Sequence, residues 1–105
     1  MSRPAGFPLG RREEALERAQ EAVELYRELA AAQLDAFRLD LAISLSVLAD
    51  CLESLMRLND SVQFDEGAVK ALGPMFLSTP APFSRLMAAI VSEYFRRLQT
   101  LNRAP

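Results

Sequence analysis

The amino-acid sequence predicts an all-α fold of four antiparallel helices, arranged as two helix-turn-helix units that stack in one direction. Apolar residues recur at steps of three and four along most of the 105 residues, the spacing that places them on one face of an α-helix. Two segments rich in turn-forming residues, 57–61 and 79–82, interrupt this pattern. The pattern also repeats at a fixed offset of 46 residues, and a fixed period of this size is typical of repeat proteins.

The offset of 46 residues divides the chain into two units, at about 10–55 and 56–101. Together they form a helical domain at 10–101, with a flexible lead-in expected at 1–9 and a tail at 102–105. The offset aligns Phe37 with Phe83, Ala42 with Ala88, Ser46 with Ser92, Leu52 with Leu98 and Leu55 with Leu101. The alignment runs through both helices of each unit without a gap, which is a stronger signal than any single pair.

The first predicted helix covers about residues 11–32. Glu13, Glu14 and Glu17 lie in its first turns, where the helix dipole favours negative charge. Its apolar stripe, which we expect to be buried, consists of Ala15, Leu16, Ala19, Ala22, Val23, Tyr26, Leu29 and Ala30. Residues 33–36 form a short connection to the second helix.

The second predicted helix, residues 37–56, is expected to be the central one. Its leucines at positions 41, 45, 48, 52 and 55 lie on one stripe. Ile43 and Val47 fall on nearly the opposite side, together with Asp50 and Ser54. A helix with apolar residues on two sides usually packs against more than one neighbour.

The third predicted helix covers about residues 61–77 and the fourth about 83–101. A side chain from residues 59–61 is expected to cap the third helix, because Asn, Asp and Ser accept hydrogen bonds from the first N–H groups. Gly73 and Pro74 lie inside this helix, and proline removes a backbone donor, so we expect a kink or a break there. The inward residues of the fourth helix are Met87, Val91, Tyr94, Leu98 and Leu101.

A family resemblance rests on segments 9–16 and 21–30, followed by Asp35-Ala36-Phe37, Asp40-Leu41-Ala42, Ser44-Leu45 and Leu48-Ala49. In order and spacing these residues resemble a tetratricopeptide repeat of the long-period, bacterial and fungal kind related to kinesin light chain. The second unit resembles the degenerate closing unit of such an array, through Leu72-Gly73-Pro74-Met75-Phe76-Leu77, Pro80, Phe83, Met87 and Tyr94-Phe95-Arg96-Arg97. The resemblance implies a short right-handed α–α superhelix with a groove for a protein or peptide partner.

The sequence departs from the family pattern in three ways. The turn glycine of the first unit, Gly10, becomes Met56 in the second. Related repeats carry groove asparagines that hold a peptide backbone, whereas this chain has Ser46, Val47 and Asp50 at those places. The chain also begins with the second type of helix of a unit, as the end fragment of a longer array would.

The leading functional prediction is a protein–protein interaction module with no catalysis of its own, whose partner the sequence does not identify. Its groove is expected between the second and fourth helices. The predicted groove residues are Ile43, Val47, Asp50, Ser54, Ala89, Ile90, Glu93 and Arg97. The alternative is a structural piece that self-associates, for example as a homodimer, because about three repeat units are normally needed for independent stability.

An enzyme is the least favoured hypothesis. The chain has no histidine, so the commonest base of a nucleophile–base pair is missing. Arg96 and Arg97 could hold an anionic substrate, but adjacent helical residues point about 100° apart and the C-terminal end of a helix repels anions. We expect Arg96 to face solvent and Arg97 to border the groove. Cys51 lies beside Asp50 and Glu53, which oppose a thiolate, and is expected to be inert.

Composition narrows the classes of partner and site. The net charge is −2, with 14 acidic and 12 basic residues, so no general attraction to nucleic acid or anionic membranes is expected. No apolar run approaches the roughly 18 residues of a membrane span, and no signal peptide is evident. One cysteine excludes an internal disulfide framework, which favours the cytoplasm. No metal or cofactor is predicted: one helix carries the acidic residues Glu13, Glu14, Glu17 and Glu21, which we interpret as a solvated face.

Overall fold

The computed structural model describes residues 9–103 and confirms the all-α fold class. The described part of the chain forms four helices, α1 (Leu9–Ala32), α2 (Leu34–Ser54), α3 (Leu58–Ser78) and α4 (Pro80–Arg103). The lead-in predicted for residues 1–9 and the tail predicted for 102–105 lie largely outside the described residues. Where they overlap, at Leu9 and at residues 102–103, the chain is helical.

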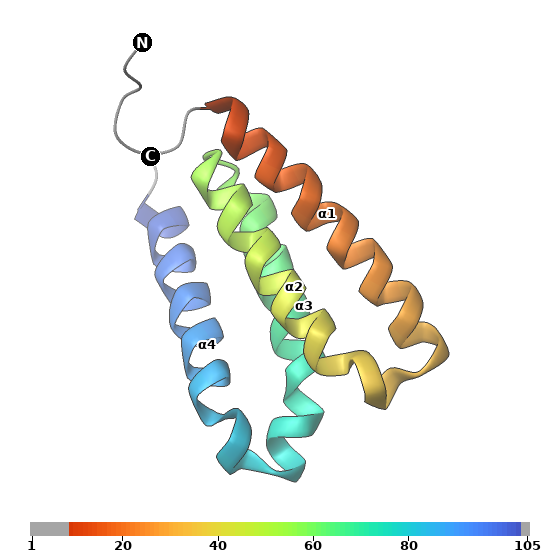
Figure 1. Cartoon of the computed structure of the whole chain (residues 1–105). Helices are drawn as coiled ribbons and strands as arrows, with labels where there is room; N and C mark the ends of the chain where they lie inside the picture. The colour runs from red at the N-terminus through yellow and green to blue at the C-terminus, as the bar shows by residue number, and fades with distance from the viewer. Residues whose placement is uncertain (1–8, 104–105) are drawn as a thin grey trace.

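The four helices form an open array in which each helix packs against the one that follows it in the chain. Figure 1 shows α1 at one edge and α4 at the other, with α2 and α3 between them. Because α1 and α4 do not pack against each other, the array is not a closed bundle. The prediction of two antiparallel helix pairs stacked in one direction is therefore confirmed, and α2 is central as expected.

The hydrophobic core runs along the centre of the array and receives side chains from all four helices. Ala42, Ala49 and Ala68 are completely buried, and their small size lets the backbones of α2 and α3 approach closely. The core residues are Leu16, Ala19, Val23, Ala42, Leu45, Leu48, Leu52, Ala68, Leu72 and Ile90. The stripe predicted for α1 is confirmed except at Ala15, which is exposed.

The connections between the helices of each pair are shorter than the sequence predicted. A single residue, Gln33, separates α1 from α2, and Thr79 alone separates α3 from α4. α4 begins at Pro80 instead of Phe83 because proline suits the first helical position, where its missing N–H is not needed. The segment 79–82 therefore both ends one helix and begins the next.

The corner between α2 and α3 is closed without glycine. Met56 has a φ of 61°, in the left-handed region that disfavours residues with a side chain. The N–H of Met56 donates to the carbonyl of Glu53 at 2.8 Å, and the N–H of Arg57 donates to that of Leu52 at 2.9 Å. This pair of bonds is a Schellman motif, which satisfies the last carbonyls of α2.

The start and the side-chain cap predicted for the third helix are wrong, and of the predicted kink or break the break is absent. α3 begins at Leu58, after Arg57, and no side chain caps it. Ser61 is fully buried instead, and its hydroxyl donates to the carbonyl of Ala49 at 2.7 Å, so it joins α3 to α2. Pro74 does not break α3, which continues to Ser78.

Candidate functional site

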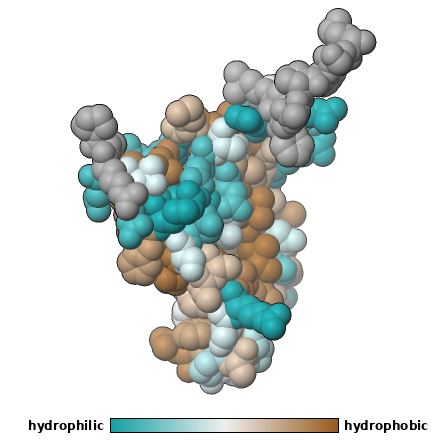
Figure 2. Space-filling model, turned by 90° about the vertical axis from the view of Figure 1, so that its left-hand side faces the viewer, coloured by the Kyte–Doolittle hydropathy of each residue, from teal (hydrophilic) through white to brown (hydrophobic). Residues whose placement is uncertain are grey.

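The α2 half of the predicted groove is accessible. Ile43, Val47, Asp50 and Ser54 are all exposed, on the side of α2 opposite its buried leucines. We call these four residues the α2 face. Ile43 is 42% exposed and Val47 46% exposed, an unusual position for two branched apolar side chains on the central helix of an array. Figure 2 shows the molecule from the left-hand side of Figure 1, the side of α4, where brown apolar patches lie beside a teal polar region.

The α4 half of the predicted groove needs correction at two residues. Ala89 is exposed and Glu93 is half-buried, as a groove position requires. Ile90 is only 2% exposed, however, and Arg97 only 1%. Both side chains point into the molecule, because α4 lies with this side against the core and the other helices. Neither residue lines an open groove.

The internal repeat contains the information that would have placed the α4 residues correctly. The offset of 46 aligns the α2 face with Ala89, Glu93, Arg96 and Thr100, none of which is buried. It aligns Ile90 with Ser44 and Arg97 with Cys51, and Ser44 is buried in α2. Applying the offset strictly would therefore have replaced the two wrong residues with Arg96 and Thr100.

Arg97 is the centre of a charged cluster that joins α4 to α2 and α3. Its Nη1 donates to both oxygens of Asp65, at 2.8 and 2.9 Å. Its Nε donates to Glu53 at 3.0 Å, and its Nη2 donates to Asp50 at 2.5 Å. Glu93, one turn earlier on α4, lies 3.7 Å from Nη2. We call Asp50, Glu53, Asp65, Glu93, Arg96 and Arg97 the Arg97 cluster.

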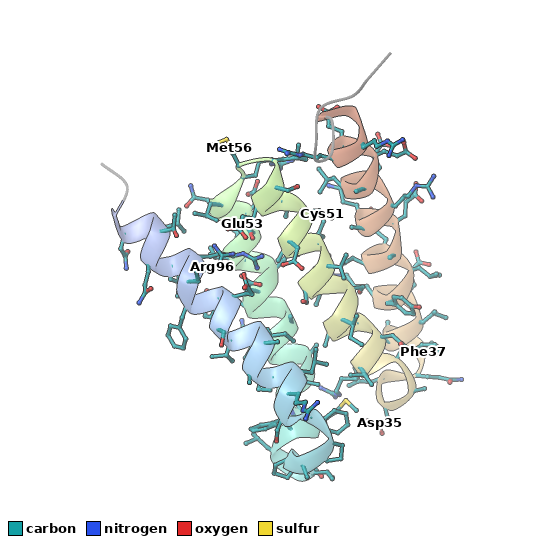
Figure 3. The ribbon with its side chains drawn as sticks, turned by 60° about the vertical axis from the view of Figure 1, so that its left-hand side comes forward. Asp35, Phe37, Cys51, Glu53, Met56 and Arg96 are labelled. Carbon is teal, nitrogen blue, oxygen red and sulfur yellow. The ribbon has the colours of Figure 1, made fainter. Side chains whose placement is uncertain are left out.

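Arg96 also reaches Glu53, which the sequence argument did not expect of two adjacent arginines. Its Nη1 donates to Glu53 at 2.8 Å, while Nε donates to Glu93 at 3.1 Å. Figure 3 shows Arg96 and Glu53 reaching toward each other from α4 and α2. Arg96 approaches from the exposed side and Arg97 from the buried side, so one carboxylate accepts from both. Arg96 is partly exposed, as predicted.

The environment shifts the pKa values of the cluster in different directions. Burial raises the pKa of Asp65 above its usual range, and its contacts with Arg97 offset this only in part. The hydrogen bonds from Arg96 lower the pKa of Glu53. Burial alone would lower the pKa of Arg97, but its hydrogen bonds to Asp50, Asp65 and Glu53 prevail and raise it. Arg97 therefore stays charged, with its donors engaged by carboxylates.

A second feature is a hollow of about 770 Å³ between α1 and α2. Its lining residues are Arg11, Arg12, Glu14, Ala15, Arg18, Asp50, Cys51 and Ser54. Arg12 donates to the carbonyl of Ser54 at 3.2 Å, and Arg18 pairs with Glu14 at 3.0 Å. Burial raises the pKa of the Cys51 thiol, and nearby Asp50 raises it further, so the thiolate is disfavoured.

Residues 9–103 contain no group of three or more His, Cys, Asp or Glu residues arranged to hold a metal ion. Within the same range no helix has the length and apolar character to cross a membrane.

Comparison with known proteins does not assign the chain to a family. No protein-family model matches it, and no curated protein or solved structure matches it either.

Proposed function

We propose that this chain is a protein–protein interaction module without catalytic activity. The observation that carries the proposal is the exposure of Ile43 and Val47 on the central helix. Exposed apolar residues that share one face are typical of interaction sites, whereas isolated ones are not. The binding face would consist of the α2 face together with Ala89, Glu93, Arg96 and Thr100 of α4.

The chemistry of the site favours binding over catalysis. Arg97 is enclosed and bonded to Asp50, Glu53 and Asp65, so it has little capacity left for a substrate anion. The Cys51 thiol has a raised pKa, which opposes nucleophilic chemistry. The single cysteine, which cannot form an internal disulfide, supports a cytoplasmic setting.

We also propose that the array is of the tetratricopeptide type. Two observations support this. Each helix packs on the next in an open array, and the offset of 46 aligns positions of similar exposure, such as Ile43 with Ala89 and Ser54 with Thr100. Such arrays bind partners on an extended surface formed by successive repeats.

The test is capture of native partners by the wild-type chain and by two variants with the same chemical change. Val47→Glu places a charge on the α2 face. Leu77→Glu makes the same change at the C-terminal end of α3, where Leu77 is 80% exposed. Ile90 is unsuitable because a charge there would enter the core. Circular dichroism establishes that each variant is folded.

We expect specific partners to bind the wild type and Leu77→Glu equally and to be lost with Val47→Glu, by about tenfold or more in affinity. Partners that bind all three proteins equally would place the binding face elsewhere and refute the assignment.

A further inference from the structure

One flank of α2 is buried against α3, and the equivalent flank of α4 is open. The offset of 46 aligns Ala49 with Phe95. Ala49 is completely buried and its carbonyl accepts the hydrogen bond from Ser61 of α3. Phe95 is 58% exposed. Ala42, also completely buried, aligns with the exposed Ala88. α4 therefore presents to solvent the flank with which α2 binds the next helix.

At the other edge of the array, the hollow between α1 and α2 corresponds to the place that α2 occupies against the second unit. The offset aligns its lining residues Ala15 and Asp50 with Ser61 and Arg96 of the second unit. In that unit α2 occupies the corresponding place, because it accepts hydrogen bonds from Ser61 at Ala49 and from Arg96 at Glu53. Within residues 9–103 no such helix lies opposite Ala15, which is exposed. The hollow is thus the counterpart of the space that α2 fills.

The two edge helices carry opposite net charge. α1 contains six glutamates and four arginines, a net charge of −2. α4 contains four arginines and one glutamate, a net charge of +3, or +2 without the buried Arg97, whose charge carboxylates of α2 and α3 already engage. Two such helices attract each other when they approach, whereas two copies of the same edge repel. Over the whole helices, charge therefore favours contact between unlike edges. The hollow itself adds no negative charge, because three arginines and two acidic residues line it.

We propose that copies of this chain associate head to tail, with α4 of one copy against α1 of the next and Phe95 inserted into the hollow. Phe95 is larger than its equivalent Ala49, and Ala15 is smaller than its equivalent Ser61, so space is available where the ring needs it. The arginines at the rim of the hollow can pack against the ring faces. The contact repeats the α2–α3 interface between copies. The hollow shares Asp50 and Ser54 with the α2 face, but the proposal rests on Phe95 and Ala15, which lie outside the proposed binding face.

A contact between two different surfaces does not close after two copies, so it leads to chains of copies. This distinguishes it from a two-fold dimer. The test is sedimentation velocity from about 1 µM to about 1 mM, the range in which small interfaces dissociate. Phe95→Ala removes the inserted ring and restores the residue that α2 carries. Ala15→Arg fills the hollow, and Leu77→Ala removes an exposed apolar side chain elsewhere.

We expect the wild type and Leu77→Ala to grow beyond dimers as concentration rises. Phe95→Ala and Ala15→Arg should each remain monomeric, with self-association weakened about tenfold or more. An equimolar mixture of these two variants keeps one intact junction, so it should form a dimer and stop there. Circular dichroism of each variant establishes that the helices persist.

The proposal is overturned by any of three results. The first is a wild type that stays monomeric over the whole range. The second is that the Ala15→Arg variant dimerises by itself and that adding Phe95→Ala to it abolishes the dimer, which would indicate a two-fold contact between two α4 helices. The third is a mixture of the two variants that remains monomeric.

Discussion

The two helix-turn-helix units have different chemistry at two positions that the offset of 46 aligns. The offset of 46 aligns Ala19 with Asp65 and Cys51 with Arg97. In the first unit the buried Ala19 belongs to the apolar core, and the half-buried Cys51 packs against that core. In the second unit Asp65 and Arg97 are both buried and form an ion pair at 2.8 Å. The same helix arrangement is therefore compatible with apolar packing in one unit and with an ion pair in the other.

This difference has a consequence for tolerance to mutation. An apolar contact loses stability in proportion to the surface and volume removed. A buried ion pair responds to the loss of either partner much more strongly, because the remaining charge stays buried without compensation. Replacing both partners together is often close to neutral. The second unit should therefore be the more sensitive of the two to single substitutions.

The largest effect is expected for Arg97→Met. Removal of the guanidinium leaves Asp65 buried without its partner, and we expect a loss of about 3–5 kcal/mol in the free energy of unfolding. Denaturant unfolding followed by circular dichroism measures this loss. The double variant Asp65→Ala, Arg97→Met removes both charges and should recover a large part of it. A loss below about 1 kcal/mol for Arg97→Met alone would mean that the pair behaves like a surface salt bridge.

The next largest effect is expected for Leu16→Ala in the first unit. Leu16 is buried in the apolar contact of α1 with the core. Truncation of a buried leucine to alanine costs about 2–5 kcal/mol, and we expect a loss of about 2–3 kcal/mol here. The adjacent exposed residue provides the control, since Glu17→Ala should change stability by no more than about 0.5 kcal/mol. The same unfolding experiment applies. Equal effects of the two variants would contradict the assigned packing of α1.

A smaller effect of opposite sign is expected for Met56→Gly. Glycine adopts the left-handed conformation of Met56 without steric cost, but it also increases the entropy of the unfolded chain. The net result should be a gain of about 0.5–1 kcal/mol. Met56→Ala keeps the strain and should give no gain. A thermal unfolding midpoint that does not rise with glycine would show that the corner is unstrained.

The smallest effect is expected for Glu53→Gln, and it depends on pH. Hydrogen bonds from Arg96 lower the pKa of Glu53 below its ordinary value of 4.5. The folded state therefore favours the ionised form, and this stabilisation is present above pH 4.5 and is lost as pH falls through the lowered pKa. The raised pKa of Asp65 acts in the opposite direction, since its protonation favours the folded state.

Glu53→Gln should lower stability at pH 7 by less than about 1 kcal/mol, because Glu53 and Arg96 are partly exposed and the buried Arg97 keeps Asp50 and Asp65 as charged partners. Between pH 5 and pH 3 the variant should lose less stability than the wild type. Unfolding midpoints measured across this range would detect the difference. Parallel curves for the two proteins would exclude Glu53 as a source of acid sensitivity.

The sequence predicted the helices well and the charged contacts poorly, for physical reasons. The leucines of α2 have one favourable environment, so their spacing alone identified the buried side. Arg97 has two possible environments, because an arginine can remain in water or be buried if enough carboxylates surround it. The carboxylates in question lie 32 to 47 residues away, beyond the reach of a pattern along one helix. The repeat offset did indicate that neither Ile90 nor Arg97 belongs to the groove, but it does not indicate which carboxylates Arg97 meets.

The open array also has a kinetic consequence. Each helix packs against its neighbours in sequence, so most of the contacts are local and need little chain closure before they form. Proteins with this property fold in microseconds to milliseconds. An array of this kind also opens from its edges, since most of the packing of an outer helix is against one neighbour. Backbone amides of α1 and α4 should therefore exchange their hydrogens with solvent before those of α2 and α3.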